Sequence, residues 1–160
     1  MKKLLLARIF SSLLTGCAPG YVSTPVSINS NDHKLQEVKI KYAEFAQKVK
    51  SINLETADTG SKPGNYKRLV EEAIREQLKA PDSAKFSGMT SPRKELIVKE
   101  GDFIYGYSTC VYVNAKNSYG GYVGKQLYWI FLRNNQVLRV QNTNDAYGDI
   151  IFVDRPVNCT

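Results

Sequence analysis

The chain has 160 residues, of which 42% are hydrophobic and 23% charged, a composition typical of a globular protein rather than a disordered one. This length gives room for one domain. The formal net charge is +7, but the sequence has no run of five like charges, so the charge gives little support to nucleic-acid binding.

The N-terminus combines basic residues, a short apolar stretch and small residues. Lys2 and Lys3 precede the apolar stretch from Leu4 to Leu14, which Arg8 interrupts. A membrane-spanning helix needs roughly twenty apolar residues, so this stretch is too short to span a bilayer. The pattern predicts a secretory signal over residues 1–16, whose removal takes away three positive charges and no acid. The mature chain would then have a net charge of +4.

The signal ends in Leu14-Thr15-Gly16-Cys17, which resembles the lipobox of bacterial lipoproteins. In that family the cysteine sulfur carries a diacylglyceryl group with palmitate-type chains, bonded as a thioether, and the cysteine becomes the mature N-terminus. The resemblance therefore implies a lipid anchor at Cys17 and attachment to a membrane without spanning it. Ala18 stands where an aspartate would favour retention at the inner membrane, which implies the outer membrane and a domain facing the periplasm.

Residues 18–33 contain two prolines, one glycine and many small polar side chains. This composition is typical of a flexible linker. We therefore expect residues 17–33 to form a lipidated tether, which holds a globular domain over 34–160 away from the membrane surface.

A helical pattern follows over residues 34–52. Its apolar residues recur at alternating spacings of 3 and 4, which predicts an amphipathic helix. They are Leu35, Val38, Tyr42, Phe45, Val49 and Ile52. Two interpretations stay open: the helix packs on its own domain, or it forms a separate stalk that pairs with another chain. This row of apolar side chains, which we call the seam, is shorter than the three to four heptads that indicate a coiled coil.

A loop over residues 53–65 separates this helix from a second amphipathic one. Apolar residues from Tyr66 to Leu78 again follow the helical period, and Asn65 is a suitable N-cap. Pro81 ends the pattern, because the residue before a proline disfavours the helical conformation.

After Pro81 the period becomes that of strands. Alternating or continuous apolar segments are bounded by glycine and asparagine turns, which predicts consecutive strands. The expected strands are 84–89, 96–99, 103–113, 126–132, 137–140 and 150–153. Helices followed by strands indicate an α+β domain, in which one or two N-terminal helices pack on a meandering antiparallel β-sheet.

The number of cysteines is consistent with the lipobox. The chain has three cysteines, and acylation of Cys17 would leave Cys110 and Cys159 as an even pair in an oxidising compartment. We expect these two to form a disulfide, which would also fasten the C-terminal tail. The alternative is two separate thiols, with Cys110 as a small core residue.

Two segments of the second half are distinctive. They are Pro81-Asp82-Ser83-Ala84-Lys85-Phe86 and the run VNAKNSYGGYVG over 113–124. Together with Cys110, they resemble a family of small uncharacterised bacterial and phage-borne envelope proteins over residues 80–135. In this chain Val111 and Tyr112 follow the cysteine, where that family has a glycine. The resemblance implies an envelope location, with a link to mobile elements, but no mechanism.

Residues 114–124 of this run predict a loop, because glycine and asparagine tolerate the conformations of sharp reversals. One interpretation is a recognition loop whose tyrosines contact a sugar or a peptide. The other is a long hairpin whose tyrosines cover the edge of the sheet. The candidate binding residues are Asn114, Lys116, Asn117, Tyr119, Gly120, Gly121 and Tyr122. The loop lacks the lysine-serine/threonine ending of a phosphate-binding loop.

Catalytic residues are scarce. The single histidine, His33, lies beside the expected tether, so no Ser-His or Cys-His pair and no histidine-based metal site is predicted. Glu71 and Glu72 are adjacent on a helix and point apart. Three carboxylates near one turn, Glu95, Glu100 and Asp102, leave a carboxylate-only hydrolase as an alternative.

The sequence therefore predicts a non-enzymatic, lipid-anchored envelope protein without cofactor or metal. Its partners would be the membrane, through the lipid, and an envelope protein, but not nucleic acid. The alternative is a module that binds peptidoglycan or another glycan through the tyrosines of the sheet and loop.

Overall fold

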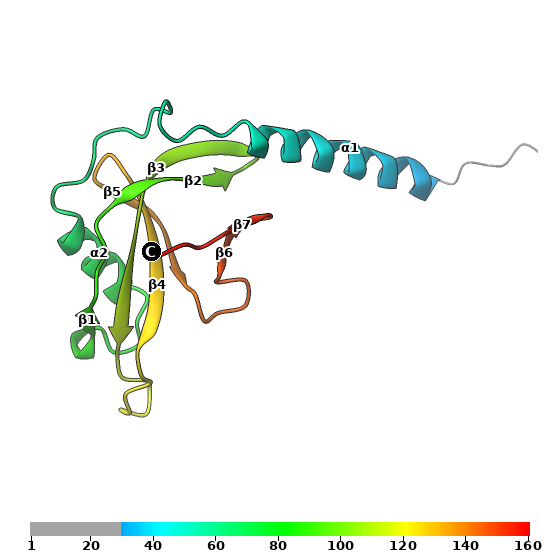
Figure 1. Ribbon diagram of the computed structural model, residues 1–160. Helices are drawn as coiled ribbons and strands as arrows, with labels where there is room; N and C mark the ends of the chain where they lie inside the picture. Colours follow the sequence, from blue (N-terminus) through cyan, green and yellow to red (C-terminus); the bar gives the residue numbers. More distant parts are fainter. Residues whose placement is uncertain (1–29) are drawn as a thin grey trace, which may run out of the picture. The chain divides into compact units, whose positions relative to one another are not determined.

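The computed structural model of the chain describes residues 30–160, and side chains from residue 32 onward (Figure 1). Cys17, the expected signal and the first part of the expected tether lie outside the described residues. The chain divides into two compact units between Lys48 and Val49. The first described element is the helix α1, Ser30–Lys50. All other helices and strands belong to the second unit.

Helix α1 begins before the expected start at Lys34. Residues 30–33, expected as part of the tether, are helical. Asp32 lies in the first turn, where a carboxylate interacts favourably with the helix dipole. The apolar side chains Leu35, Val38 and Tyr42 are each more than half exposed.

The second unit starts with two short helical elements and continues with strands only. The elements are α2 (Tyr66–Arg75), the 3-10 helix η1 (Pro81–Ser83), β1 (Lys85–Ser87), β2 (Arg93–Lys99), β3 (Asp102–Asn114), β4 (Gln126–Arg133), β5 (Gln136–Asn142), β6 (Ile150–Phe152) and β7 (Arg155–Pro156). The α+β class is confirmed. The strands β2, β3, β4 and β5 pair in chain order and are all antiparallel, which is the expected meander.

The 13-residue strand β3 is the centre of the sheet. Along one side it pairs with β4, and along the other it pairs first with β2 and then with β1. Thr90 lies between β1 and β2 and continues the pairing there. Its N–H donates to the Cys110 carbonyl at 2.9 Å, and the Cys110 N–H donates to Thr90 Oγ1 at 2.9 Å.

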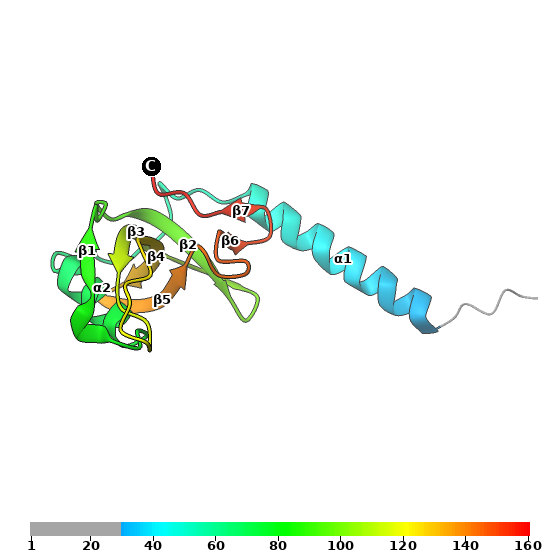
Figure 2. The ribbon, with the colours of Figure 1, turned by 90° about the horizontal axis from the view of Figure 1, so that it is seen from below.

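The two faces of the sheet carry separate apolar clusters, because successive strand residues point to opposite faces. On one face α2 packs through Val70 and Ile74 against buried side chains of β3 and β4. The opposite cluster contains Trp129 and Phe131 together with Ile151 of β6. Figure 2 shows α2 and the β6–β7 hairpin on different sides of the sheet.

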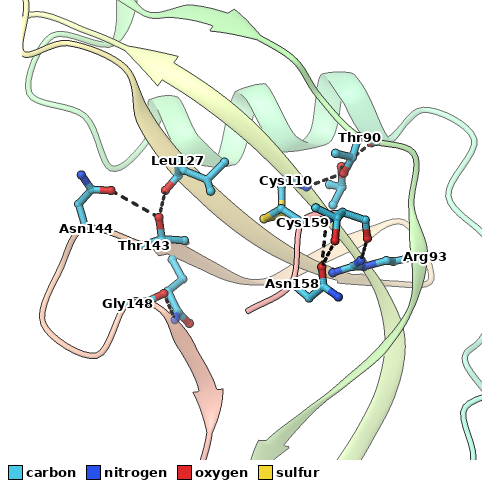
Figure 3. The surroundings of a disulfide bond; sticks show 12 residues. Thr90, Arg93, Cys110, Leu127, Thr143, Asn144, Gly148, Asn158 and Cys159 are labelled. Atoms are coloured by element: carbon cyan, nitrogen blue, oxygen red, sulfur yellow. Dashed lines mark hydrogen bonds between the residues drawn. A yellow bond between two sulfur atoms is a disulfide. The ribbon is translucent and has the colours of Figure 1, made fainter. Parts of the chain in front are cut away.

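The C-terminal segment is fastened to the sheet by three contacts. Cys110 and Cys159 form a disulfide with 5.6 Å between their Cα atoms, as predicted (Figure 3). An Arg93 N–H donates to the carbonyl of Thr160. Arg155 pairs with the buried Glu95 carboxylate at 2.5 Å. The last residues of the chain are therefore part of the folded domain.

Several element bounds differ from expectation. Helix α2 ends at Arg75, before the predicted Leu78, and η1 begins at Pro81. Strand β1 is shorter than 84–89, and β2 begins at Arg93 rather than at Leu96. The short strand β7 was not predicted. For the strands, pairing decides these differences: β1 and β2 extend as far as they pair with β3, and β7 exists because it pairs with β6.

Candidate functional site: the loop between β3 and β4

The loop from Asn114 to Gly124 extends the β3–β4 hairpin. Lys116 and Tyr122 form an antiparallel bridge, and the Val123 N–H donates to the Ala115 carbonyl at 3.2 Å. The Gly124 N–H donates to Asn114 Oδ1 at 3.1 Å. The segment is therefore an extension of the hairpin, with Asn114 and Lys116 at its base and Tyr119 exposed rather than covering the edge of the sheet.

Asn117 organises the tip of the loop. Its N–H donates to the Gly121 carbonyl at 2.9 Å, and its Oδ1 accepts the N–H groups of Tyr119 at 3.0 Å and Gly121 at 3.1 Å. Gly120 and Gly124 have φ angles of 83° and 89°. The two glycines thus supply the reversals, whereas the asparagines act as side-chain acceptors that satisfy loop N–H groups.

The two tyrosines of the loop have different surroundings. Tyr119 at the tip is 96% exposed. Near the base, the ammonium groups of Lys85 and Lys116 lie 4.7 Å and 5.6 Å from the ring centroid of Tyr122. These distances allow cation–π attraction. The ring of Tyr119 is therefore exposed to solvent, whereas the ring of Tyr122 is in contact with the ammonium groups of two lysines.

The two distinctive sequence segments come together at this loop. Lys85 of β1 is the register partner of Asn114 at the end of β3. The Lys116 N–H donates to Ser83 Oγ at 2.8 Å, and the Ser83 hydroxyl donates to the Ala80 carbonyl at 2.7 Å. The segment around Pro81 therefore holds the base of the loop.

The carboxylates considered for catalysis lie in different surroundings. Glu95 is only 5% exposed and is paired with Arg155. Glu100 and Asp102 are exposed beside the turn between β2 and β3. Glu72 forms an ion pair with Arg68 at 2.8 Å on the outside of α2. Glu95 therefore holds the C-terminal segment through its ion pair with Arg155. The sequence did not indicate this role, because the two residues are far apart in the chain.

Within residues 30–160, no three His, Cys, Asp or Glu side chains are grouped as a metal site would require. Nor does that part of the chain contain a helix long and apolar enough to cross a bilayer.

Sequence reasoning missed a groove along β5. It has a volume of about 360 Å³ between α2 and β5 and continues into a second hollow of about 330 Å³ beside the turn over 145–148. We call this the β5 groove. Its lining residues are Leu69, Glu72, Ala73, Glu76, Gln77, Val137–Asn142 and Asp145–Gly148. Helical periodicity indicates which face of α2 is buried, but not where the helix leaves the sheet uncovered.

Comparison of the chain with models of protein families, with curated proteins and with solved structures finds no match.

Proposed function

We propose that the protein is a non-enzymatic lipoprotein of the cell envelope, which presents its folded domain to a protein partner outside the cytoplasm. The observation that carries the proposal is the pairing of Cys110 with Cys159. It uses two of the three cysteines. The remaining one, Cys17, is the cysteine of the lipobox-like sequence.

The disulfide supports a location outside the cytoplasm, because such bonds persist in oxidising compartments and are rare in the cytosol. The two cysteines are 49 positions apart. Chain-entropy estimates give about 4 kcal/mol of stabilisation for a loop of this length. The free energy of unfolding of a small domain is typically about 5–15 kcal/mol. On this estimate the disulfide contributes a large part of it.

Acylation of Cys17 would determine where the domain acts. One fatty chain gives marginal membrane binding, whereas two or more give stable attachment at about 0.8 kcal/mol per buried methylene. Ala18 after the cysteine favours the outer membrane, with the domain in the periplasm. The seam of α1 and the loop over 114–124 are the proposed protein contacts, because both expose aromatic or aliphatic side chains.

Metabolic labelling with a palmitate analogue tests the anchor. The full chain should incorporate label and fractionate with membranes, and Cys17→Ser should abolish both. The matched control replaces the two cysteines of the disulfide instead. The double variant Cys110→Ser with Cys159→Ser should still be labelled. Unchanged labelling and fractionation of Cys17→Ser would refute the proposal.

A glycan-binding module is the second candidate, favoured by the exposed ring of Tyr119 on a loop whose backbone is fixed by Asn117. Aromatic rings of this kind can stack on sugars. Pull-down with purified peptidoglycan sacculi tests it. Retention that is lost on Tyr119→Ala with Tyr122→Ala would support a glycan site.

The matched control for the pull-down is Tyr147→Asn. Tyr147 is also exposed, at 81%, but lies on another loop with a φ angle of 61°, which asparagine tolerates. The control should retain full binding. No retention of the unmodified chain would exclude the glycan-binding function.

A further inference from the structure

Strand β5 is an open edge of the sheet. It pairs with β4 on one side, and no strand of the described chain pairs with it on the other. Figure 2 shows β5 at the border of the sheet. An edge strand presents backbone N–H and C=O groups that can pair with another extended chain. Leu138, which is 44% exposed, adds an apolar side chain to this edge.

The β5 groove gives an added strand two walls. One wall is formed by α2 from Leu69 onward and by Glu76 and Gln77, which follow the helix, and the other is the turn over 145–148. Val140 and Arg139 of β5 line both parts of the groove. The groove thus runs along the strand, as addition of an extended peptide requires.

The wall formed by α2 is acidic. It carries the carboxylates of Glu72 and Glu76, and it is the C-terminal half of the helix, where the helix dipole is negative. The neighbouring arginines are engaged elsewhere. Arg75 donates to the Pro81 carbonyl and lies 5.0 Å from the ring centroid of Phe86.

Arg139, although it lines the groove, is also held by the fold. It donates to the Ile151 carbonyl at 2.8 Å, and its guanidinium lies 5.8 Å from the ring of Trp129 on the opposite face. Arg68 neutralises part of the charge through its ion pair with Glu72. The Asp145 carboxylate, which also lines the groove, offsets the charge of Arg139. Glu76 therefore leaves the groove with a negative charge that a basic side chain would complement.

The same charge disfavours a second copy of this chain as the occupant. Edge-to-edge pairing of two β5 strands would extend the sheet and bring two α2 helices together on one face. The Glu72 and Glu76 carboxylates of both copies would then approach one another, and like charges at an interface are unfavourable.

From the edge, the groove and the charge, we infer that β5 binds an extended polypeptide segment that adds a strand to the sheet. The segment places a lysine or arginine beside Glu76 and an apolar side chain beside Leu69 and Ala73. Alternate residues of a strand point to the same side, so these two residues are separated by one position. The inference rests on the proposed contact with a protein, but not on the lipid anchor.

A positional-scanning library of acetylated octapeptides tests the inference on the purified full chain. Bound peptides should be enriched in lysine or arginine two positions from an apolar residue. Hydrogen exchange should slow when such a peptide binds, at those alternate amides of residues 137–142 that point away from β4. A version with N-methyl groups on alternate residues should not bind, because it cannot pair with an edge strand.

Charge reversal locates the basic residue. Glu76→Lys should weaken binding of the selected peptide by about threefold to tenfold, the size of a partly exposed charge pair. Glu71→Lys makes the same charge change on α2, outside the groove lining, and should leave binding unchanged. Circular dichroism of both variants confirms that α2 remains folded.

Three outcomes would overturn the inference: no selection of basic peptides, equal loss in both glutamate variants, or slowed exchange only on self-association of the chain. Failure of the lipoprotein proposal is a separate result, because it appears as absent acylation of Cys17 and does not affect peptide binding in solution.

Discussion

At the scale of single residues, Gly106 shows most clearly why a particular side chain is required. It lies in β3 opposite Glu95. A Cβ atom at this position would lie 2.4 Å from the Leu132 carbonyl oxygen and 2.7 Å from Cζ of Phe131. Both contacts are shorter than van der Waals separation, and one involves the backbone of β4, so the sheet would have to move.

Gly106→Ala should therefore lower the free energy of unfolding by about 1–3 kcal/mol, the usual effect of overpacking. Urea denaturation of the oxidised protein measures the change. The matched control is Gly64→Ala, because no atom lies within 4 Å of a Cβ built there. The control should change stability by no more than about 0.5 kcal/mol. Equal effects of the two substitutions would contradict the close approach of β3 and β4.

The structure predicts a shifted titration for the Asp58 carboxyl group. The Gly60 N–H donates to its carboxylate at 2.9 Å, and Arg133 pairs with it at 2.9 Å. The Gly60 hydrogen bond first, and then the Arg133 hydrogen bond and charge, hold the pKa of Asp58 below its ordinary value of 3.8. The charged carboxylate therefore favours the folded state above that pH, and this contribution is lost as the pH falls through the lowered pKa.

Arg133→Gln should raise the pKa of Asp58 in the folded protein without fully restoring the ordinary value, because the Gly60 hydrogen bond remains. An NMR titration of the Asp58 carboxyl carbon in both proteins measures this. An identical midpoint in the two proteins would show that Arg133 does not act on the carboxylate.

At the scale of elements, much of the fold could be predicted from local pattern. The turn at Asn134-Asn135 is an example: both residues have positive φ angles, of 49° and 61°, and connect β4 to β5. Asparagine is among the few residues that tolerate such angles, so the type of turn follows from composition. The alternation along 103–113 likewise predicted the central strand.

Other elements depend on partners that are distant in sequence. The position of Thr90 between β1 and β2, opposite Cys110, cannot be read from periodicity. The same is true of the link between Ser83 and Lys116, which joins the two distinctive segments. Local pattern therefore predicted the candidate loop, but not its support or the β5 groove, because these arise from packing between elements.

The loop itself offers a test at this scale. Asn117→Ala removes the acceptor of the Tyr119 and Gly121 N–H groups. Their hydrogen exchange should become faster, whereas the free energy of unfolding should change by less than about 1 kcal/mol because the site is exposed. Unchanged exchange at both amides would mean that the side chain does not order the tip.

Asn144→Ala is the control for this measurement. Asn144 is also an exposed loop asparagine, but it contacts Thr143. Exchange at Tyr119 and Gly121 should be the same in this variant as in the unmodified chain.

At the scale of the whole molecule, the second unit combines a fastened C-terminal segment with two separate surfaces that could bind a partner. The C-terminal segment is bonded to the central strand through Cys110 and Cys159, and ion-paired through Arg155 and Glu95. The loop over 114–124 and the β5 groove are separate surfaces of the second unit. Under the proposed function, the lipid at Cys17 attaches the protein to the membrane, and these surfaces bind the protein partner.

The intact mass of the protein extracted from membranes, denatured and alkylated without reduction, tests this account most directly. The account predicts the mass of residues 17–160 plus acyl groups, with no alkyl group added, because Cys17 is acylated and Cys110 is bonded to Cys159. An unacylated chain that begins at Met1, or the addition of alkyl groups to its cysteines, would contradict it.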